Sequence, residues 1–106
     1  MAKRKPSLYN KPDDGCWVCH NPNVCMHHIY EGNGRRQVSD VEGCYVFLCP
    51  NHHTTSEFGV HSDKTLEMFF KEDCQRRWER REGEGPETRQ RFIRLFTMSY
   101  LKEDEQ

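Results

Sequence analysis

Two short ligand pairs constrain this sequence more than any other feature. Cys16 and Cys19 form a C-x-x-C pair, and Cys49 and His52 form a C-x-x-H pair further along the chain. Together they supply the four sulfur and nitrogen ligands that a tetrahedral structural zinc requires. One such pair is weak grounds for a metal site, but two pairs with this spacing are specific. The sequence therefore predicts a zinc ion that ties the turn at Cys16 to the residues around His52.

The length of the chain gives such a cross-link a large role. The 106 residues allow one small domain, and 34% of them are apolar. A domain of this size buries only about 60 to 68% of the surface that its unfolded chain exposes. No apolar run is long enough to span a membrane, and the basic N-terminus does not lead into an apolar signal segment. We therefore expect a cytoplasmic protein without a membrane partner.

The six cysteines admit more than one interpretation. In a reducing compartment, clustered Cys and His are more often metal ligands than disulfides. A disulfide scaffold, a redox pair and ordinary buried thiols remain as alternatives. Either Cys25 or Cys44 could replace a member of the zinc set, although both are expected in the core. Cys74 lies on the apolar stripe of a predicted helix and is also expected in the core.

The apolar pattern predicts an α+β fold. Apolar stretches at residues 26–30 and 44–48 predict an antiparallel pair of strands, and the polar, glycine-containing segment between them predicts a long loop. Pro50 suits the first position of a short helix that would stop by Gly59. Apolar residues spaced by three and four predict two more helices, at about 62–81 and 87–101.

The same pattern divides the chain into one domain with two flanking segments. Residues 1–15 contain prolines and basic side chains and predict an extended basic arm, and the single domain covers residues 16–101. Residues 102–106 form an acidic tail.

Four further histidines suggest a second site. His27 and His28 are consecutive in a predicted strand, where neighbouring side chains point to opposite faces, so they must have different roles. His53 is turned by about 100° around the helix from His52 and can face a different ion. His61 could close such a site. The alternative is that these histidines are solvent-exposed or ordinary core residues.

Several of these histidines and cysteines match the pattern of a known protein family. His27-His28-Ile29, a glycine-containing loop and Leu48-Cys49-Pro50-Asn51-His52-His53 resemble the HNH endonucleases, and more closely the small HNH-type proteins of phages and prophages. The resemblance implies a small zinc-stabilised ββα-metal domain, here with two additional C-terminal helices. At the place of the family's middle asparagine this chain has Cys44, so the loop that orients the catalytic base must be held in another way.

The resemblance also implies roles for individual residues. His28 matches the general base, and the structural zinc would be held by Cys16, Cys19, Cys49 and His52. The ligands of a catalytic divalent ion would be His27 and His53, with His61 as a further ligand. That ion could be Mg²⁺, Mn²⁺, Ni²⁺ or Zn²⁺. On the predicted loop, Arg35 and Arg36 could contact a phosphate or simply be solvated.

The implied function is a metal-dependent DNA endonuclease that hydrolyses phosphodiester bonds with one metal ion. The implied partners are DNA and phage or host proteins of recombination or packaging, in a bacterial host cell. The alternative is a catalytically silent zinc module that binds DNA or protein. The net charge of −1 argues neither for nor against binding to nucleic acid, because the placement of the charges matters more than their sum. The basic arm and the cluster Arg76, Arg77, Arg80 and Arg81 could follow a DNA backbone, although acidic neighbours predict that the cluster is an ion-paired helix face.

Overall fold

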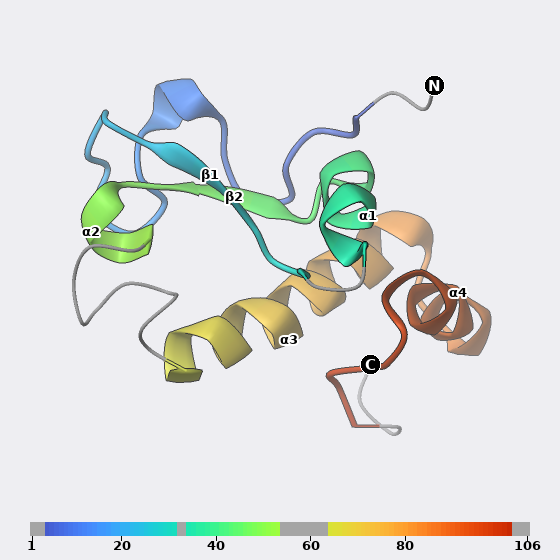
Figure 1. Cartoon of the computed structure of the whole chain (residues 1–106). Coiled ribbons are helices and arrows are strands. Elements are labelled where there is room, and N and C mark those ends of the chain that lie inside the picture. The colour runs from blue at the N-terminus through green and yellow to red at the C-terminus, as the bar shows by residue number, and fades with distance from the viewer. Residues whose placement is uncertain (1–3, 32–33, 54–63, 103–106) are drawn as a thin grey trace.

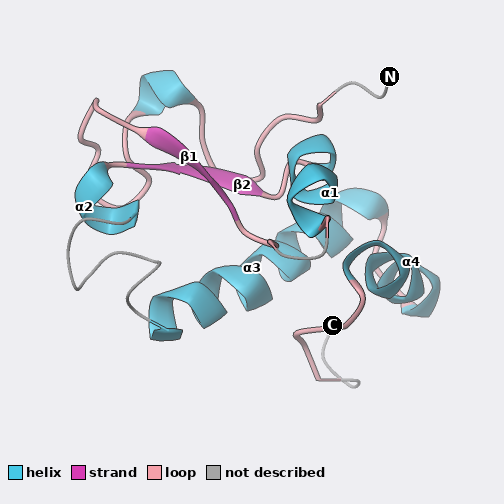
Figure 2. Ribbon diagram, in the orientation of Figure 1, coloured by secondary structure: helices cyan, strands magenta, loops and turns pink. Residues whose placement is uncertain are grey.

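The chain is a small mixed α+β domain in the computed structural model, which describes residues 4–31, 34–53 and 64–102 (Figures 1 and 2). Its elements in chain order are a 3₁₀ turn η1 (Pro12–Asp14), β1 (Cys25–His28), α1 (Arg35–Glu42), β2 (Tyr45–Leu48), α2 (Pro50–His53), α3 (Lys64–Glu82) and α4 (Pro86–Phe96). Figure 1 shows α3 running beneath the sheet, with α2 at one end of the sheet and α1 near the other. The α+β class is therefore confirmed.

The two strands pair antiparallel, as predicted. Cys25 lies opposite Leu48, and His28 lies opposite Tyr45. Because side chains alternate along a strand, Cys25 and His27 share one face of the sheet and His28 lies on the other. The face that carries His27 is turned toward α3, where the His27 and Phe70 ring centroids are 6.4 Å apart.

Helix α1 corrects the prediction of a loop between the strands. The Ser39 hydroxyl is buried, where it accepts a hydrogen bond from the Tyr30 amide (3.0 Å) and donates one to the Tyr30 carbonyl (2.8 Å). Gly43 ends the helix in the left-handed conformation, with φ 83°, and donates its N–H to the Ser39 carbonyl. The helix is thus stabilised by contacts with a distant segment, which local composition does not reveal.

Helices α3 and α4 form where two helices were predicted, with different ends. The second stops at Phe96 rather than continuing to 101, because Thr97 takes a left-handed conformation with φ 75°. Between these helices and the sheet lies an aromatic cluster. Its ring centroids are separated by 5.4 Å for Trp78 and Phe92 and by 4.6 Å for Tyr30 and Phe96. Tyr30, which follows β1, contacts α4 through its ring and α3 through its hydroxyl, which donates to the Lys71 carbonyl at 2.6 Å.

The N-terminal segment packs against the domain. Lys5 N–H donates to the Val41 carbonyl (2.9 Å) and Leu8 N–H to the Gly43 carbonyl (3.0 Å). The Tyr9 ring lies 5.1 Å from the Trp17 ring and 5.5 Å from the Phe70 ring. The segment predicted as an extended arm therefore has little regular structure but contributes to the core. The acidic tail from residue 103 onward lies outside the described residues. None of the described helices combines the length and the apolar character needed to cross a membrane.

Candidate metal centre and histidine site

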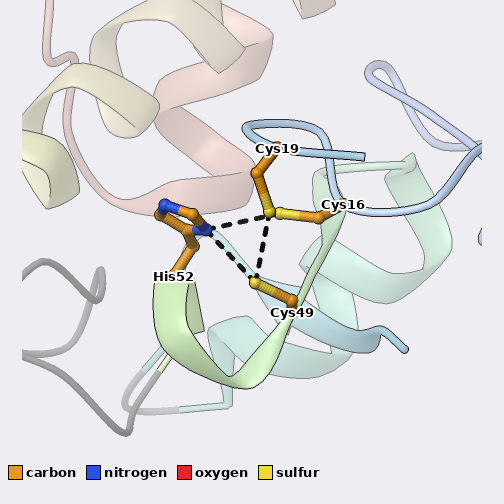
Figure 3. Close-up of side chains that lie close together, drawn as sticks. All are labelled: Cys16, Cys19, Cys49 and His52. Carbon is orange, nitrogen blue, oxygen red and sulfur yellow. Dashed lines mark hydrogen bonds between the residues drawn. The ribbon is translucent and has the colours of Figure 1, made fainter. Parts of the chain in front are cut away.

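The four predicted zinc ligands come together in what we call the Cys₃His cluster. Figure 3 shows the side chains of Cys16, Cys19, Cys49 and His52 pointing toward one another. Their ligand atoms all lie within 4.8 Å of one another. Sγ of Cys49 lies 3.6 Å from Sγ of Cys19 and 3.2 Å from Nδ1 of His52, and Sγ of Cys16 lies 3.7 Å from the same Nδ1. Zn–S bonds of ~2.3 Å and Zn–N bonds of ~2.0 Å in a tetrahedron require ligand separations of about 3.5 to 3.8 Å. The cluster could therefore hold a metal ion, and its donor set fits zinc.

Two tight turns present these ligands. In the first, Cys16 N–H donates to the Asn21 carbonyl (2.8 Å), and His20 N–H donates to the Cys16 carbonyl (2.7 Å). Trp17 N–H donates to the Phe47 carbonyl (3.0 Å), which fixes this turn to β2. In the second, the amides of His52 and His53 both donate to the Cys49 carbonyl at 3.0 Å. These backbone hydrogen bonds shape both turns so that their ligand side chains face one another.

The cluster favours ionisation of one of its thiols. Burial disfavours the Cys16 thiolate, but hydrogen bonds from the backbone amides of Cys49, Cys19 and Val18 outweigh burial and lower the pKa of Cys16 to about 6. For Cys19, a backbone hydrogen bond at Asn21 favours the thiolate, but burial and the neighbouring sulfurs together raise the pKa. One sulfur is therefore available as a thiolate at neutral pH, and a cation would promote ionisation of the others.

Two residues of the second predicted site lie close together. His27 is buried, and its ring centroid lies 5.2 Å from that of His53. His61 lies outside the described residues. Within the described ranges, the Cys₃His cluster is the only group of three or more ligand side chains that converges. The structure thus brings the predicted pair His27 and His53 side by side without a third described ligand at the distance of the first cluster.

Cys25 is a neighbour of this pair that the sequence prediction placed wrongly. Its Sγ lies 3.0 Å from Nδ1 of His53, and its side chain is exposed. We expected it in the core, but it is the first residue of β1 and its side chain is exposed. Cys44 and Cys74, by contrast, are buried as predicted. His20 is exposed.

The predicted base, His28, has two charged neighbours from α1. Its Nε2 lies 3.1 Å from Oδ1 of Asp40, and its Nδ1 lies 3.4 Å from Nε of Arg36. Oδ2 of Asp40 accepts a hydrogen bond from Nε of Arg4 at 3.0 Å. Sequence reasoning missed Asp40 because it predicted a loop here. The available signal was the four-residue spacing of Arg36 and Asp40, which places both on one face of a helix.

The basic residues differ in what they contact. Arg36 is exposed beside His28, whereas Arg35 has a buried Nε that finds no hydrogen-bond partner within the described residues. Arg77 pairs with Asp73 (2.8 Å) and Arg81 with Glu82 (2.9 Å), so the helix face is ion-paired as expected. Lys5 of the arm pairs with Glu42 (2.9 Å). Of these basic side chains, Arg36 is the one that lies beside His28.

No protein-family model, curated protein or solved structure matches this chain. Two groups of side chains in the described residues combine ligand or acid–base chemistry: the Cys₃His cluster, and the histidines of β1 and α2 with their neighbours on α1.

Proposed function

We propose that this protein is a metal-dependent DNA endonuclease of the HNH type, working inside the cell and stabilised by a separate structural zinc. One observation carries the proposal: consecutive residues of β1 place one imidazole beside His53 and the next beside a carboxylate and a guanidinium. Phosphodiester hydrolysis needs these groups together: ligands for a cation, a proton acceptor and a positive charge for the phosphate.

The Cys₃His cluster serves as the structural zinc site in this proposal. Four protein ligands complete a tetrahedral shell and leave no position for substrate or water. The cluster joins the turn at Cys16, the end of β2 and the start of α2. It therefore fixes His53, one residue beyond His52, relative to β1.

The histidine site would carry out the reaction. His27 and His53 would hold a divalent ion, with His61 as the further ligand that the resemblance implies. When bound, such an ion stabilises the charge that builds on the phosphoryl oxygens. His28 would accept the proton of the attacking water through Nδ1, and Arg36 would contact the phosphate. Imidazole ligation is compatible with Mg²⁺, Mn²⁺, Ni²⁺ or Zn²⁺, and the nearby Cys25 sulfur favours the softer members of that series.

Plasmid nicking by the purified protein, with each of these four cations, tests the proposal. His28→Ala should retain zinc and fold while cleavage falls by roughly 10² to 10⁴. His53→Ala should regain part of its activity at high cation concentration, because a weakened site can still fill, whereas no cation replaces the base. His20→Ala, which removes an exposed histidine of the Cys16 turn, is the matched control. Equal cleavage by wild type and His28→Ala would refute the role of His28.

A catalytically silent zinc module that binds DNA or protein is the second candidate. It is favoured by the finding that only the Cys₃His cluster converges among the described residues. This candidate expects one tightly bound metal per chain and no cleavage with any of the four cations. Wild-type protein that behaves in this way would replace the nuclease proposal with the binding module.

A further inference from the structure

The contacts of His28 define which of its ring nitrogens carries the proton. Nε2 faces Oδ1 of Asp40 at 3.1 Å, and Nδ1 faces Nε of Arg36 at 3.4 Å. Both partners come from one face of α1, because they are four residues apart. The His28 side chain is only 12% exposed, so its two nitrogens meet these neighbours rather than bulk water.

The chemistry of the two partners selects a single tautomer. Burial of the Asp40 carboxyl opposes its ionisation, but hydrogen bonds from His28 and Arg4 outweigh burial and lower its pKa, so Asp40 is a carboxylate at neutral pH. A carboxylate only accepts hydrogen bonds, so Nε2 must carry a proton. A guanidinium only donates hydrogen bonds, so Nδ1 must present its lone pair.

Asp40 is itself held in place from two directions. Its Oδ2 accepts a hydrogen bond from Nε of Arg4 at 3.0 Å, which occupies the second carboxylate oxygen. The preceding residue, Ser39, is buried and bound to the backbone of Tyr30 through its hydroxyl. The carboxylate therefore has a defined orientation toward the imidazole.

We propose that Asp40 is a positioning residue that keeps the proton of His28 on Nε2, and that Arg36 covers Nδ1 until a phosphate draws the guanidinium away. The effect of these two residues on catalysis rests on the proposed nuclease function, but the assignment of the His28 tautomer does not. The contact between Arg36 and Nδ1 is long, and a phosphate offers the guanidinium shorter, charge-assisted and bidentate bonds. Substrate would thus uncover the nitrogen that accepts the proton. Asp40 would orient the base, a task that the resemblance assigns to an asparagine whose place is taken by Cys44 in this chain.

The decisive variant is Asp40→Asn. Arg4 can only donate, so it should claim the amide oxygen of the new side chain and leave the amide NH₂ facing Nε2 of His28. The imidazole must then accept at Nε2 and move its proton to Nδ1. Nitrogen chemical shifts of ¹⁵N-histidine-labelled, zinc-loaded protein distinguish the two tautomers. We expect Nε2–H in the wild type and Nδ1–H in Asp40→Asn.

A rescue variant separates orientation from charge. In the double variant Asp40→Asn with Arg4→Ala, Arg4 no longer donates to the amide oxygen. The amide group can then rotate so that its oxygen faces Nε2 of His28, and the Nε2–H tautomer should return. Glu42→Gln is the matched control, since it removes a carboxylate two residues further along α1 that binds Trp78 and Lys5 and not His28. It should leave the His28 tautomer unchanged.

The result of the tautomer measurement can be distinguished from the result of the nuclease test. If the wild type cleaves DNA, Asp40→Asn should lower kcat by about 10²-fold with little change in KM, and the double variant should recover part of that loss. If the wild type cleaves nothing, the nuclease proposal fails while the tautomer measurement still decides the role of Asp40. A wild-type Nδ1–H tautomer, or an Asp40→Asn protein with the wild-type tautomer, would overturn the proposal.

Discussion

The two ends of this domain are held together by different kinds of interaction. At the end that contains α2, two tight turns meet around the Cys₃His cluster, where Cys19 and Val18 are exposed. At the other end, α3 and α4 bury a cluster of aromatic rings in which Trp78 and Phe92 have no exposed surface. Apolar burial acts at any metal concentration, whereas ligation depends on a cation and on deprotonated thiols. His53, one residue beyond the cluster, therefore lies at the end that a bound metal would stabilise, whereas His28 lies toward α1 at the other end of the sheet.

Loss of the metal should have the largest effect. Cys49→Ser removes a sulfur that lies 3.6 Å from Sγ of Cys19 and 3.2 Å from Nδ1 of His52, and because metal binding is coupled to folding it should cost several kcal/mol. Denaturant unfolding with metal analysis measures this change. Cys25→Ser, at an exposed cysteine outside the cluster, should retain both metal and stability. A folded Cys49→Ser protein with wild-type stability would show that the cluster is not a folding element.

Truncation in the aromatic cluster should come next. Phe92 lies 5.4 Å from Trp78 and 4.7 Å from Phe96, so Phe92→Ala should destabilise the chain by about 3 to 5 kcal/mol. The folded fraction should still bind one metal per chain, because the cluster is remote from the substitution. Phe69→Ala, at a ring 44% exposed on α3, is the control and should cost little. Loss of metal along with the ring would mean that the two ends form one cooperative unit.

Gln75 gives a smaller test of the helical end. Its buried amide donates to Glu79 and Ser99 at 2.9 Å each and accepts from the Tyr100 amide at 2.7 Å. Gln75→Ala removes the acceptor of the Tyr100 amide, whereas Glu79 keeps Arg89 and Ser99 keeps Leu101, and the loss should cost about 1 to 3 kcal/mol. Thermal unfolding should show this loss with unchanged metal content. The exposed Gln90→Ala on α4 serves as the comparison, and an equal loss there would contradict the assignment.

The smallest expected effect is a pH dependence at the junction of α3 and α4. Burial opposes ionisation of Glu82, but Arg91, Arg81 and Lys5 outweigh it and lower its pKa below the ordinary 4.5. A depressed carboxyl pKa stabilises the fold above that ordinary value, and this contribution disappears as the pH falls through the lower, folded value. Arg91 is 44% exposed, so the effect should stay below about 1 kcal/mol. Glu82→Gln should flatten the acid limb of the stability curve, and an unchanged limb would exclude this ion pair as its origin.

The sequence predicted the parts of the fold that local patterns determine. Alternating and three-to-four spacings located both strands and helices α3 and α4, and Pro50 located the start of α2. Helix α1 was missed because it lies between glycines and has only Val38 and Val41 as apolar residues, so its stability comes from contacts with Tyr30 and the arm. Such tertiary contacts leave no periodic signal.

The two candidate sites differ in the same way in how far the sequence predicts them. The four ligands of the Cys₃His cluster were predictable because two fixed spacings and one coordination number determine them. The neighbours of His28 were not, because Asp40 reaches it only through the missed helix. Cys25 was misplaced because the apolar pattern of the sequence does not show that the first residue of this short strand is exposed.

Gly43 has an evolutionary consequence. A side chain at this position would collide with the carbonyl oxygen of Pro6, in addition to the strain of its left-handed backbone. An N-terminal segment seated over α1 therefore requires glycine here, whereas a chain without that segment could also accept asparagine, which tolerates the same backbone. Among homologous sequences, glycine at this position should accompany the presence of the segment, and asparagine should occur only where the segment has been lost.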